Sequence, residues 1–416
     1  MLQPAATLAC TCTGPAHRCL RHRPILGHGL VTSEGDVWKK HRAVMRPVFE
    51  FEALQRLLPV FIGAADRLMK RWAPQLQAGK QPTVELGLTF RTVTLEVIAE
   101  VALGWSPEDA SVLPHMFEEV LDELNLRMFK PWRAFMPLEI AHRRRLRDLN
   151  EMVLQIIRAR RAGHADGTYV IKSADEAAAS SGKSYKASEL GGDMLDMLLM
   201  SGAGMSDHQL MDELKTMLLA GHETSSMMML WSCYLLAKHP EALQKARAEV
   251  DAAIGTDPTK WGSFDDYKDL KYLEWVMFEA MRLYCPVPVL SRYTLEDVIL
   301  EGKLVPAAST VILSVWSMHR SKKVWGADAD EFRPERFSPE ESRSRHPFAY
   351  LPFSLGPRNC IGRNLAIMEG KVVLATILQR FSLSVTPGQP NDIPTDCYVI
   401  PVRPEGGLYM NIRPRK

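Results

Sequence analysis

Residues 353–362 read FSLGPRNCIG, a turn with a single cysteine at its exit. Apolar residues at helical spacing follow, and they predict a helix that begins near Ile361. Cys360 therefore lies just before a helix N-terminus, where unpaired amides and the helix dipole favour a thiolate over a neutral thiol. Gly356 permits backbone angles that a side chain would forbid, so loop amides can point at the sulfur. Gly362 leaves room for a flat group beside the first helical turn.

Most lone cysteines are small buried core residues, so the interpretation depends on the length of the motif. From Phe353 to Gly362 the run Phe-x-x-Gly-x-Arg-x-Cys-x-Gly fixes five positions in ten residues. It resembles the haem-binding loop of the cytochrome P450 monooxygenases. The resemblance implies that Cys360 is the axial ligand of the iron of haem b, where a thiolate favours cleavage of the O–O bond. It also implies that Phe353, Arg358 and Gly362 contact the haem.

The composition is that of a globular protein. Of the 416 residues, 46% are hydrophobic and 24% are charged, which suits one large domain or two ordinary ones. The 51 basic and 49 acidic residues leave a net charge of +2, which indicates no nucleic-acid-binding surface. Seven cysteines without a Cys-x-x-Cys pair fit a reducing compartment better than a disulfide framework. The longest apolar run, residues 227–237, is too short to span a bilayer.

The chain divides into a short basic segment and one long domain. Residues 1–33 contain arginines but no acidic residue, which resembles an organelle transit peptide or, as we favour, the ragged start of an incomplete chain. Residues 34–416 read as one predominantly helical α+β domain, with its main sheet between residues 287 and 315 and short strands near Leu383, Val399 and Leu408. Within it, residues 164–193 are rich in Ala, Ser, Gly and Lys, and we expect a surface loop there.

A second motif lies inside a long apolar stretch without proline. Residues 206–238 predict one helix, with AGHETS at positions 220–225. Glycine weakens a helix, and a threonine hydroxyl can bond to a carbonyl one turn earlier and bend it. Taken alone, these residues would indicate an ordinary kink. The same pattern is the oxygen-activation signature of the cytochrome P450 family, which implies that Thr224 donates a hydrogen bond to bound oxygen and that Glu223 passes protons inward.

Several residues are candidates for binding the haem propionates. Trp38 and Arg42 lie four apart on one face of the helix predicted over residues 36–45, and both can donate to a carboxylate. Arg292 matches the strand arginine that contacts a propionate in the family, and Arg358 is a further candidate. Each alone could equally be a surface residue, but a buried porphyrin with two carboxylates requires such cations.

A third set of charged residues precedes the cysteine loop. Glu279 and Arg282 are three residues apart, a spacing that allows pairing on one helix face but is common and weak at a surface. The segment FRPERF, residues 332–337, follows them. The family resemblance implies that Glu279, Arg282 and Arg336 form a buried charge network, in which an unpaired member would be strongly destabilising.

These motifs extend from about residue 36 to the C-terminus and predict a haem-thiolate monooxygenase. The resemblance implies hydroxylation of a long apolar substrate with O2 and electrons from an NADPH-dependent reductase or a ferredoxin. Residues 217–225 and 312–321 look like those of plastid carotenoid-ring hydroxylases, and the fatty-acid ω-hydroxylases are almost as similar. The resemblance implies that the protein lies at the periphery of a membrane, in the plastid or the endoplasmic reticulum. The short apolar run predicts no transmembrane segment in this chain.

Two other interpretations stay open. Family members begin with an anchor or transit peptide, a proline hinge, a helix and two strands, whereas here only residues 1–35 precede the first signature helix. The sheet could therefore lack its opening strands, and the chain could be a truncated haem-binding protein without turnover. A thiol hydrolase with Cys360 as its nucleophile would need a partner histidine, which the sequence does not place.

Overall fold

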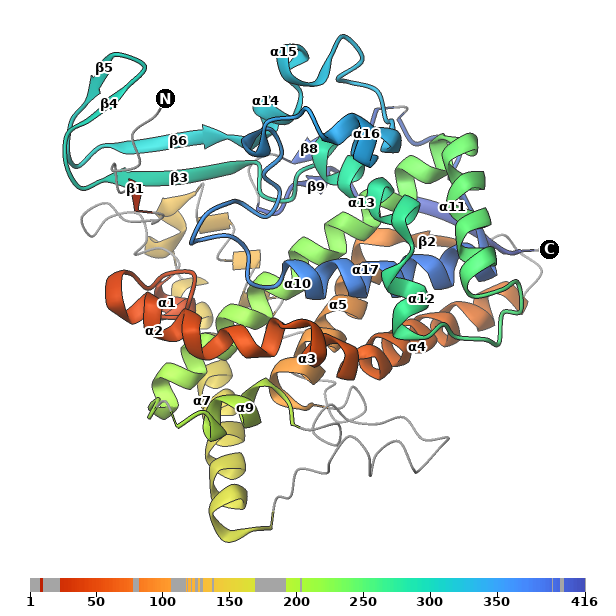
Figure 1. The fold of residues 1–416 in the computed structure, drawn as a ribbon. Coiled ribbons are helices and arrows are strands. Elements are labelled where there is room, and N and C mark those ends of the chain that lie inside the picture. The colour runs from red at the N-terminus through yellow and green to blue at the C-terminus, as the bar shows by residue number, and fades with distance from the viewer. Residues whose placement is uncertain are drawn as a thin grey trace.

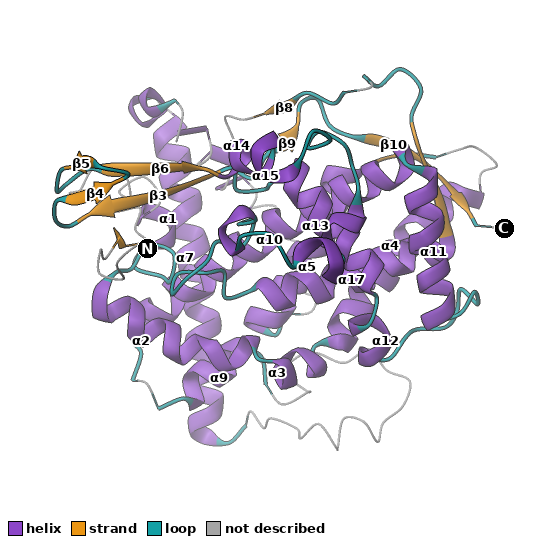
Figure 2. Ribbon diagram, turned by 45° about the horizontal axis from the view of Figure 1, so that its top comes forward, coloured by secondary structure: helices purple, strands orange, loops and turns teal. Residues whose placement is uncertain are grey.

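The structure is a computed structural model. It describes residues 8–9, 23–77, 82–105, 130–136, 138–168, 192–202, 204–390, 392–396 and 400–415, together with scattered positions between 117 and 127. Helices form most of the molecule, and short strands lie along its edges (Figures 1 and 2). The expected class, α+β with a predominance of helix, is confirmed.

The helices agree with the main periodic stretches of the sequence. In chain order they are α1 (Arg23–Leu26), α2 (Gly35–Met45), α3 (Phe51–Arg56), α4 (Leu58–Gln77), α5 (Leu86–Leu103), α7 (Leu138–Asp166), α9 (Met194–Met200), α10 (Asp207–Lys238), α11 (Pro240–Ala253), α12 (Phe264–Lys268), α13 (Lys271–Leu283), α14 (Val315–His319), α15 (Lys322–Trp325), α16 (Pro339–Ser342) and α17 (Arg363–Arg380). Single 3-10 turns lie at Arg46–Phe49, Pro131–Phe135, Pro334–Phe337 and Pro347–Ala349. Of the loop predicted over residues 164–193, the first three residues belong to α7, and residues 169–191 lie outside the described part.

Helix α10 is the central element and crosses the middle of the molecule (Figure 1). It packs against α5, α7, α13 and α17. A Cβ on Gly221 would lie 2.9 Å from Ile98 Cγ1, so this glycine lets α5 approach α10 closely. From residue 213 to residue 236 every side chain of α10 is buried except those of Leu219, Ala220 and Thr224. This half-buried turn coincides with the AGHETS motif.

The strands form four small antiparallel sheets among the described residues. They are β1 (Leu8–Ala9) with β3 (Val289–Thr294) and β6 (Thr310–Ser314), then β2 (Thr83–Glu85) with β10 (Tyr409–Pro414) and β7 (Phe381–Val385), and the hairpins β4 (Val298–Leu300) with β5 (Lys303–Val305) and β8 (Thr395–Asp396) with β9 (Arg403–Pro404). The predicted sheet at residues 287–315 and the strands near Leu383 and Leu408 are confirmed, whereas Val399 lies outside the described residues.

Whether the main sheet lacks its opening strands, as the sequence suggests, stays a prediction. Strand β1 pairs its two residues with Thr294 and Tyr293 of β3, and the residues on either side of β1 are not described. Among the described residues, no helix combines the length and the apolar character needed to cross a bilayer.

Candidate functional site

The loop before α17 folds so that Cys360 is held at its end. Ser354 and Gly356 adopt left-handed backbone angles, with φ of 56° and 82°. Glycine takes such an angle at no steric cost, whereas serine rarely does, so the turn is sharp at both positions. The turn brings the N–H of Cys360 to the carbonyl oxygen of Phe353, at 2.8 Å.

Helix α17 begins directly after the cysteine. Gly362 is its N-cap and Arg363 its first residue, two positions later than the sequence predicts. A Cβ on Gly362 would meet only Phe49 Cε1, at 3.8 Å, which is ordinary van der Waals contact. The glycine therefore leaves space beside the first helical turn, as a flat cofactor requires.

Two opposing effects act on the pKa of the Cys360 thiol. Burial raises the pKa of Cys360, and the N–H of Gly362 with the charges of Arg42 and Arg363 offsets only part of that rise. The helix start therefore does not by itself produce a thiolate. A coordinated metal cation, in contrast, deprotonates a thiol outright.

The side chain of Cys360 lies among many protein atoms but is not covered by them. Its side chain is accessible to water, although the protein that surrounds it raises the pKa of its thiol by burial. In the described part of the chain, no three His, Cys, Asp or Glu side chains group as metal ligands. A single protein thiol fits a metal whose other ligands come from a porphyrin.

Helix α2 contributes predicted haem contacts on one side of the cysteine loop. Arg42 donates through Nη1 to the carbonyl oxygen of Asn359 at 2.7 Å and through Nη2 to Asn359 Oδ1 at 2.6 Å. The Arg358 guanidinium lies 4.1 Å from the ring centroid of Trp38 and donates to Ser33 O at 2.9 Å. The structure therefore brings Trp38, Arg42 and Arg358 together.

Strand β3 brings a further cation to the same loop. Arg292 donates through Nη2 to Ser354 Oγ at 3.3 Å. Like Arg42 and Arg358, it is half-buried. Three half-buried guanidiniums that belong to the cysteine loop or bond to it fit a porphyrin that carries two propionates. The residues present are therefore compatible with haem b.

The oxygen-activation motif lies on the half-buried turn of α10. Thr224 Oγ1 donates to Ala220 O, one turn earlier, at 2.6 Å. Helix α10 nevertheless continues without interruption through this turn. The hydroxyl is thus held by the helix backbone on the part of α10 that its neighbours leave accessible.

Glu223, on the same turn, is buried and paired. Only 6% of it is exposed, and it forms an ion pair with Arg403 of β9. Arg403 also pairs with Asp122 at 3.2 Å. Burial opposes the charge of Arg403, but the carboxylates of Glu223 and Asp122 outweigh it and raise the pKa of Arg403. The sequence gives no signal for this arginine, since 180 residues separate it from Glu223.

A second residue that the sequence analysis missed is Glu369, on α17. It is 1% exposed. Burial raises the pKa of Glu369 to about 8, although the hydroxyl of Ser225 on α10 opposes the rise. Among the described residues, neither carboxyl oxygen of Glu369 has a hydrogen-bond partner, and Ser225 Oγ has none either, so nothing but burial and a nearby hydroxyl acts on this carboxyl group. An acidic residue within an apolar stripe is the only sequence signal that could have indicated it.

The charged residues of the third motif meet in the interior. Arg282 donates to Glu279 through Nε at 2.6 Å and Nη2 at 2.8 Å, and Arg336 Nε donates to Glu279 Oε1 at 3.2 Å. None of the three residues is more than 2% exposed. Arg282 also donates to His319 O and Ala329 O, and Arg336 to Trp325 O. One carboxylate and two guanidiniums therefore join α13 to the chain between α14 and α16.

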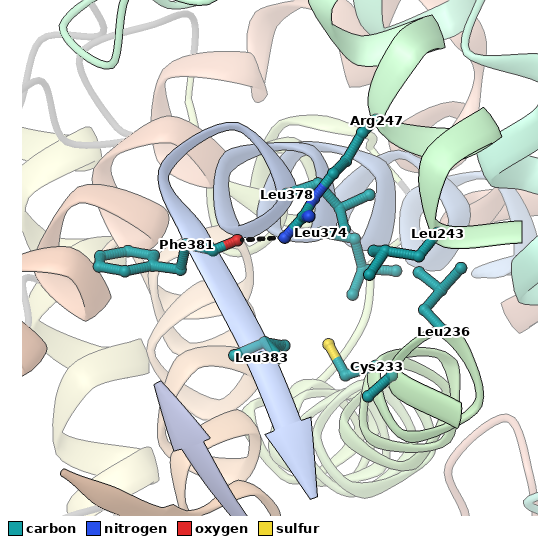
Figure 3. Close-up of a pocket in the computed structure, with 9 residues that line it drawn as sticks. Cys233, Leu236, Leu243, Arg247, Leu374, Leu378, Phe381 and Leu383 are labelled. Carbon is teal, nitrogen blue, oxygen red and sulfur yellow. Dashed lines mark hydrogen bonds between the residues drawn. The ribbon is translucent and has the colours of Figure 1, made fainter. Parts of the chain in front are cut away.

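A separate pocket lies between α10, α11, α17 and β7 (Figure 3). It is lined by Cys233, Leu236, Ala237, Leu243, Arg247, Leu374, Leu378, Phe381 and Leu383. Arg247 closes one side by donating to Phe381 O at 2.9 Å. Burial raises the pKa of the Cys233 thiol, so this cysteine is a core residue. The thiol hydrolase interpretation gains no support at Cys360 either, because no histidine is among the groups that shift its pKa.

Comparison with known proteins agrees with this geometry. The Cytochrome P450 family model matches residues 14–409. Secologanin synthase 1 of Catharanthus roseus is 30% identical over 409 residues, which cover 94% of this chain and 73% of that protein. The protein LUTEIN DEFICIENT 5, chloroplastic, of Arabidopsis thaliana is 30% identical over 381 residues, 88% of this chain and 61% of that protein.

Solved structures show the same fold. The crystal structure of the cytochrome P450DA heme domain superposes with a TM-score of 0.80 at 25% identity, covering 97% of this chain and 81% of that one. The family model, the relatives and the fold all point to the same family. The cysteine loop, the oxygen-activation turn and the buried charge network of this chain agree with that assignment. The chain belongs to the cytochrome P450 family.

Proposed function

We propose that this monooxygenase hydroxylates a long apolar substrate of the carotenoid, fatty-acid or terpenoid kind, with O2 and electrons from an NADPH-dependent reductase or a ferredoxin. Family membership gives the haem b cofactor, the monooxygenase reaction and the need for a redox partner. The proposal adds the substrate class, the kind of partner and the residues that act. The accessible Cys360 thiol among Arg42, Arg292 and Arg358 is the observation that carries it.

The haem-binding roles follow from charge and position. Haem b, when bound, supplies the activation of O2 at its iron. Cys360 would ligate that iron, and Gly362 and Phe353 would border the ring. Arg42, Arg292 and Arg358 would neutralise the propionates, with Trp38 stacked on one of these cations. Glu279, Arg282 and Arg336 would hold the chain before the cysteine loop in place.

The proton roles belong to α10. Thr224 carries a proton at Oγ1 on the accessible turn of this helix. Glu223 would resupply that proton, and to do so its carboxylate must leave Arg403, with which it is paired. Arg403 thereby restrains the acid between turnovers, because a carboxylate in an ion pair is a weak base.

The apolar substrate class is supported by the side chains near this turn. Leu219 and Ala220 are half-buried on the same turn of α10 as Thr224. Apolar side chains that remain partly exposed next to a reactive site are typical of pockets for apolar ligands. The relative LUTEIN DEFICIENT 5 carries the name of a carotenoid.

The proposal includes a peripheral membrane contact, in the plastid or the endoplasmic reticulum. Trp132, Phe135 and Ile140 are 58%, 91% and 72% exposed, on the turn before α7 and its first residues. Arg143 and Arg144 follow them and are exposed. Exposed aromatic and aliphatic side chains next to cations are typical of a segment that lies in the bilayer interface and binds anionic lipids.

A spectrum of the reduced protein with carbon monoxide tests the proposal. We expect a thiolate-type Soret band, which Cys360→Ala should abolish, with Cys233→Ala as the matched control that retains it. A retained band in Cys360→Ala would refute the ligand assignment. NADPH-dependent conversion of apolar substrates, with a reductase or a ferredoxin added, then separates a working monooxygenase from a haem-binding protein without turnover.

A further inference from the structure

Two adjacent carboxylates of α10 hold residues 27–33, the segment between α1 and α2. Asp212 Oδ2 accepts a hydrogen bond from the backbone N–H of His28 at 2.9 Å. Glu213 Oε2 accepts one from the backbone N–H of Leu30 at 3.0 Å. Alternate amides of the segment are therefore fixed to consecutive residues of α10.

The other oxygen of Glu213 holds helix α2. His41 Nδ1 lies 2.6 Å from Glu213 Oε1, which is hydrogen-bond distance. His41 is 2% exposed and Glu213 is 0% exposed. A carboxyl group buried this deeply is stabilised when both of its oxygens are hydrogen-bonded, as they are here. One side chain of α10 thus fixes both segment 27–33 and α2.

Two glycines show that segment 27–33 is fitted to this turn of α10. A Cβ on Gly27 would lie 2.0 Å from Asp212 Oδ2. A Cβ on Gly29 would lie 2.1 Å from Thr216 Oγ1 and 2.6 Å from Asp212 O. The Asp212 side chain could move away from a larger residue at position 27, but at position 29 the clash includes the backbone of α10, so a larger residue there would displace the segment from the helix.

The far ends of the same segment and helix reach the cysteine loop. Ser33, the last residue of the segment, accepts a hydrogen bond from Arg358 Nη2 at 2.9 Å through its carbonyl oxygen. Arg42 follows His41 directly and donates to Asn359 O at 2.7 Å. The stretch from residue 27 to residue 42 is therefore held by α10 on one side and by two guanidiniums of the site on the other.

We propose that Glu213 is a positioning residue for haem binding. By holding the Leu30 amide and the His41 ring, its carboxylate sets the place of Ser33 and Arg42, and through Ser33 that of Arg358. The inference rests on the proposed contacts of Arg42 and Arg358 with the haem. Glu213 itself is buried between α2 and α10 and acts only through these neighbours.

The rate at which the haem leaves the protein tests this role apart from general stability. The holoprotein is mixed with excess apomyoglobin, which captures released haem, and the transfer is followed by absorbance. Glu213→Ala removes both acceptor oxygens, so we expect transfer about tenfold faster or more, the effect of one lost charged hydrogen bond. Glu213→Gln should restore part of the wild-type rate, because its amide can accept from Leu30 and donate to the tautomer of His41 in which Nδ1 accepts.

Glu274→Ala is the matched control. Glu274 pairs with the buried Lys371 at 2.6 Å and joins α13 to α17. Its loss should lower the urea midpoint while leaving haem transfer within about twofold of wild type. If Glu213→Ala folds and transfers haem at the wild-type rate, or if Glu274→Ala accelerates transfer equally, Glu213 is not a positioning residue.

Further variants keep the test decisive. Should Glu213→Ala not fold, His41→Ala and Gly29→Ala replace it, and a wild-type transfer rate in both would overturn the inference. Arg42→Ala and Arg358→Ala test the haem contacts themselves. Fast transfer in these two but not in the Glu213 variants refutes only the positioning role, whereas wild-type transfer in all of them refutes the proposed haem contacts.

Discussion

Replacement of Glu279 by glutamine removes a carboxylate that two buried guanidiniums share. Glu279 accepts three hydrogen bonds from Arg282 and Arg336, of 2.6, 2.8 and 3.2 Å, and a fourth from the backbone N–H of Arg333 at 2.9 Å. The glutamine side chain would keep the shape and one acceptor oxygen. It would withdraw the negative charge from Arg282 and leave Arg336 with the half-exposed Asp328, which lies 2.7 Å away.

The expected loss is large compared with the total stability. Breaking a buried ion pair by removing one partner costs about 3–5 kcal/mol, against about 5–15 kcal/mol for a whole domain. The loss is not the sum over the hydrogen bonds, because Arg282 keeps His319 O and Ala329 O and Arg336 keeps Trp325 O. With a urea slope of about 3 kcal/mol per M, the midpoint should fall by about 1–1.7 M.

Urea unfolding of the holoprotein, followed by circular dichroism, measures this shift. Glu335→Gln is the matched control, since Glu335 is 34% exposed and pairs with the exposed Lys245, a contact worth about 1 kcal/mol or less. A midpoint shift for Glu279→Gln no larger than that of the control, at an unchanged slope, would refute the claim that this carboxylate holds the interior network together.

Two further predictions concern Glu369 and the membrane contact. The pKa of Glu369 is raised to about 8 from its ordinary value of 4.5, so between these values the folded state binds a proton that the unfolded state has lost, and stability falls as the pH rises. Glutamine does not titrate, so the urea midpoint of Glu369→Gln, relative to that of wild type, should rise from pH 5 to pH 8. A difference between the two midpoints that stays constant over this range would contradict the raised pKa of Glu369. Phe135→Ser combined with Ile140→Ser should reduce cosedimentation with anionic vesicles severalfold, because together they remove much of the exposed apolar surface. Val324→Ser, exposed on α15, is the control, and equal losses in both proteins would argue against the proposed face.

The sequence by itself determined the features that depend on local spacing. The turn that ends in Cys360, the helix after it and the long α10 with its AGHETS turn follow from glycine, proline and apolar periodicity within one window of the chain. The pairing of Glu279 with Arg282 follows for the same reason, since residues three apart on a helix face each other. The α+β class and the position of the main sheet are likewise consequences of local pattern.

Only the tertiary structure decided how these parts are charged and joined. Glu223 pairs with Arg403 and Glu213 lies against His41, and no local rule pairs residues so far apart in the chain. The thiol of Cys360 shows the same limit, because its helix position favours the anion whereas burial raises its pKa. Burial depends on the whole fold, so the electrostatics of the site could be read only from the packed molecule.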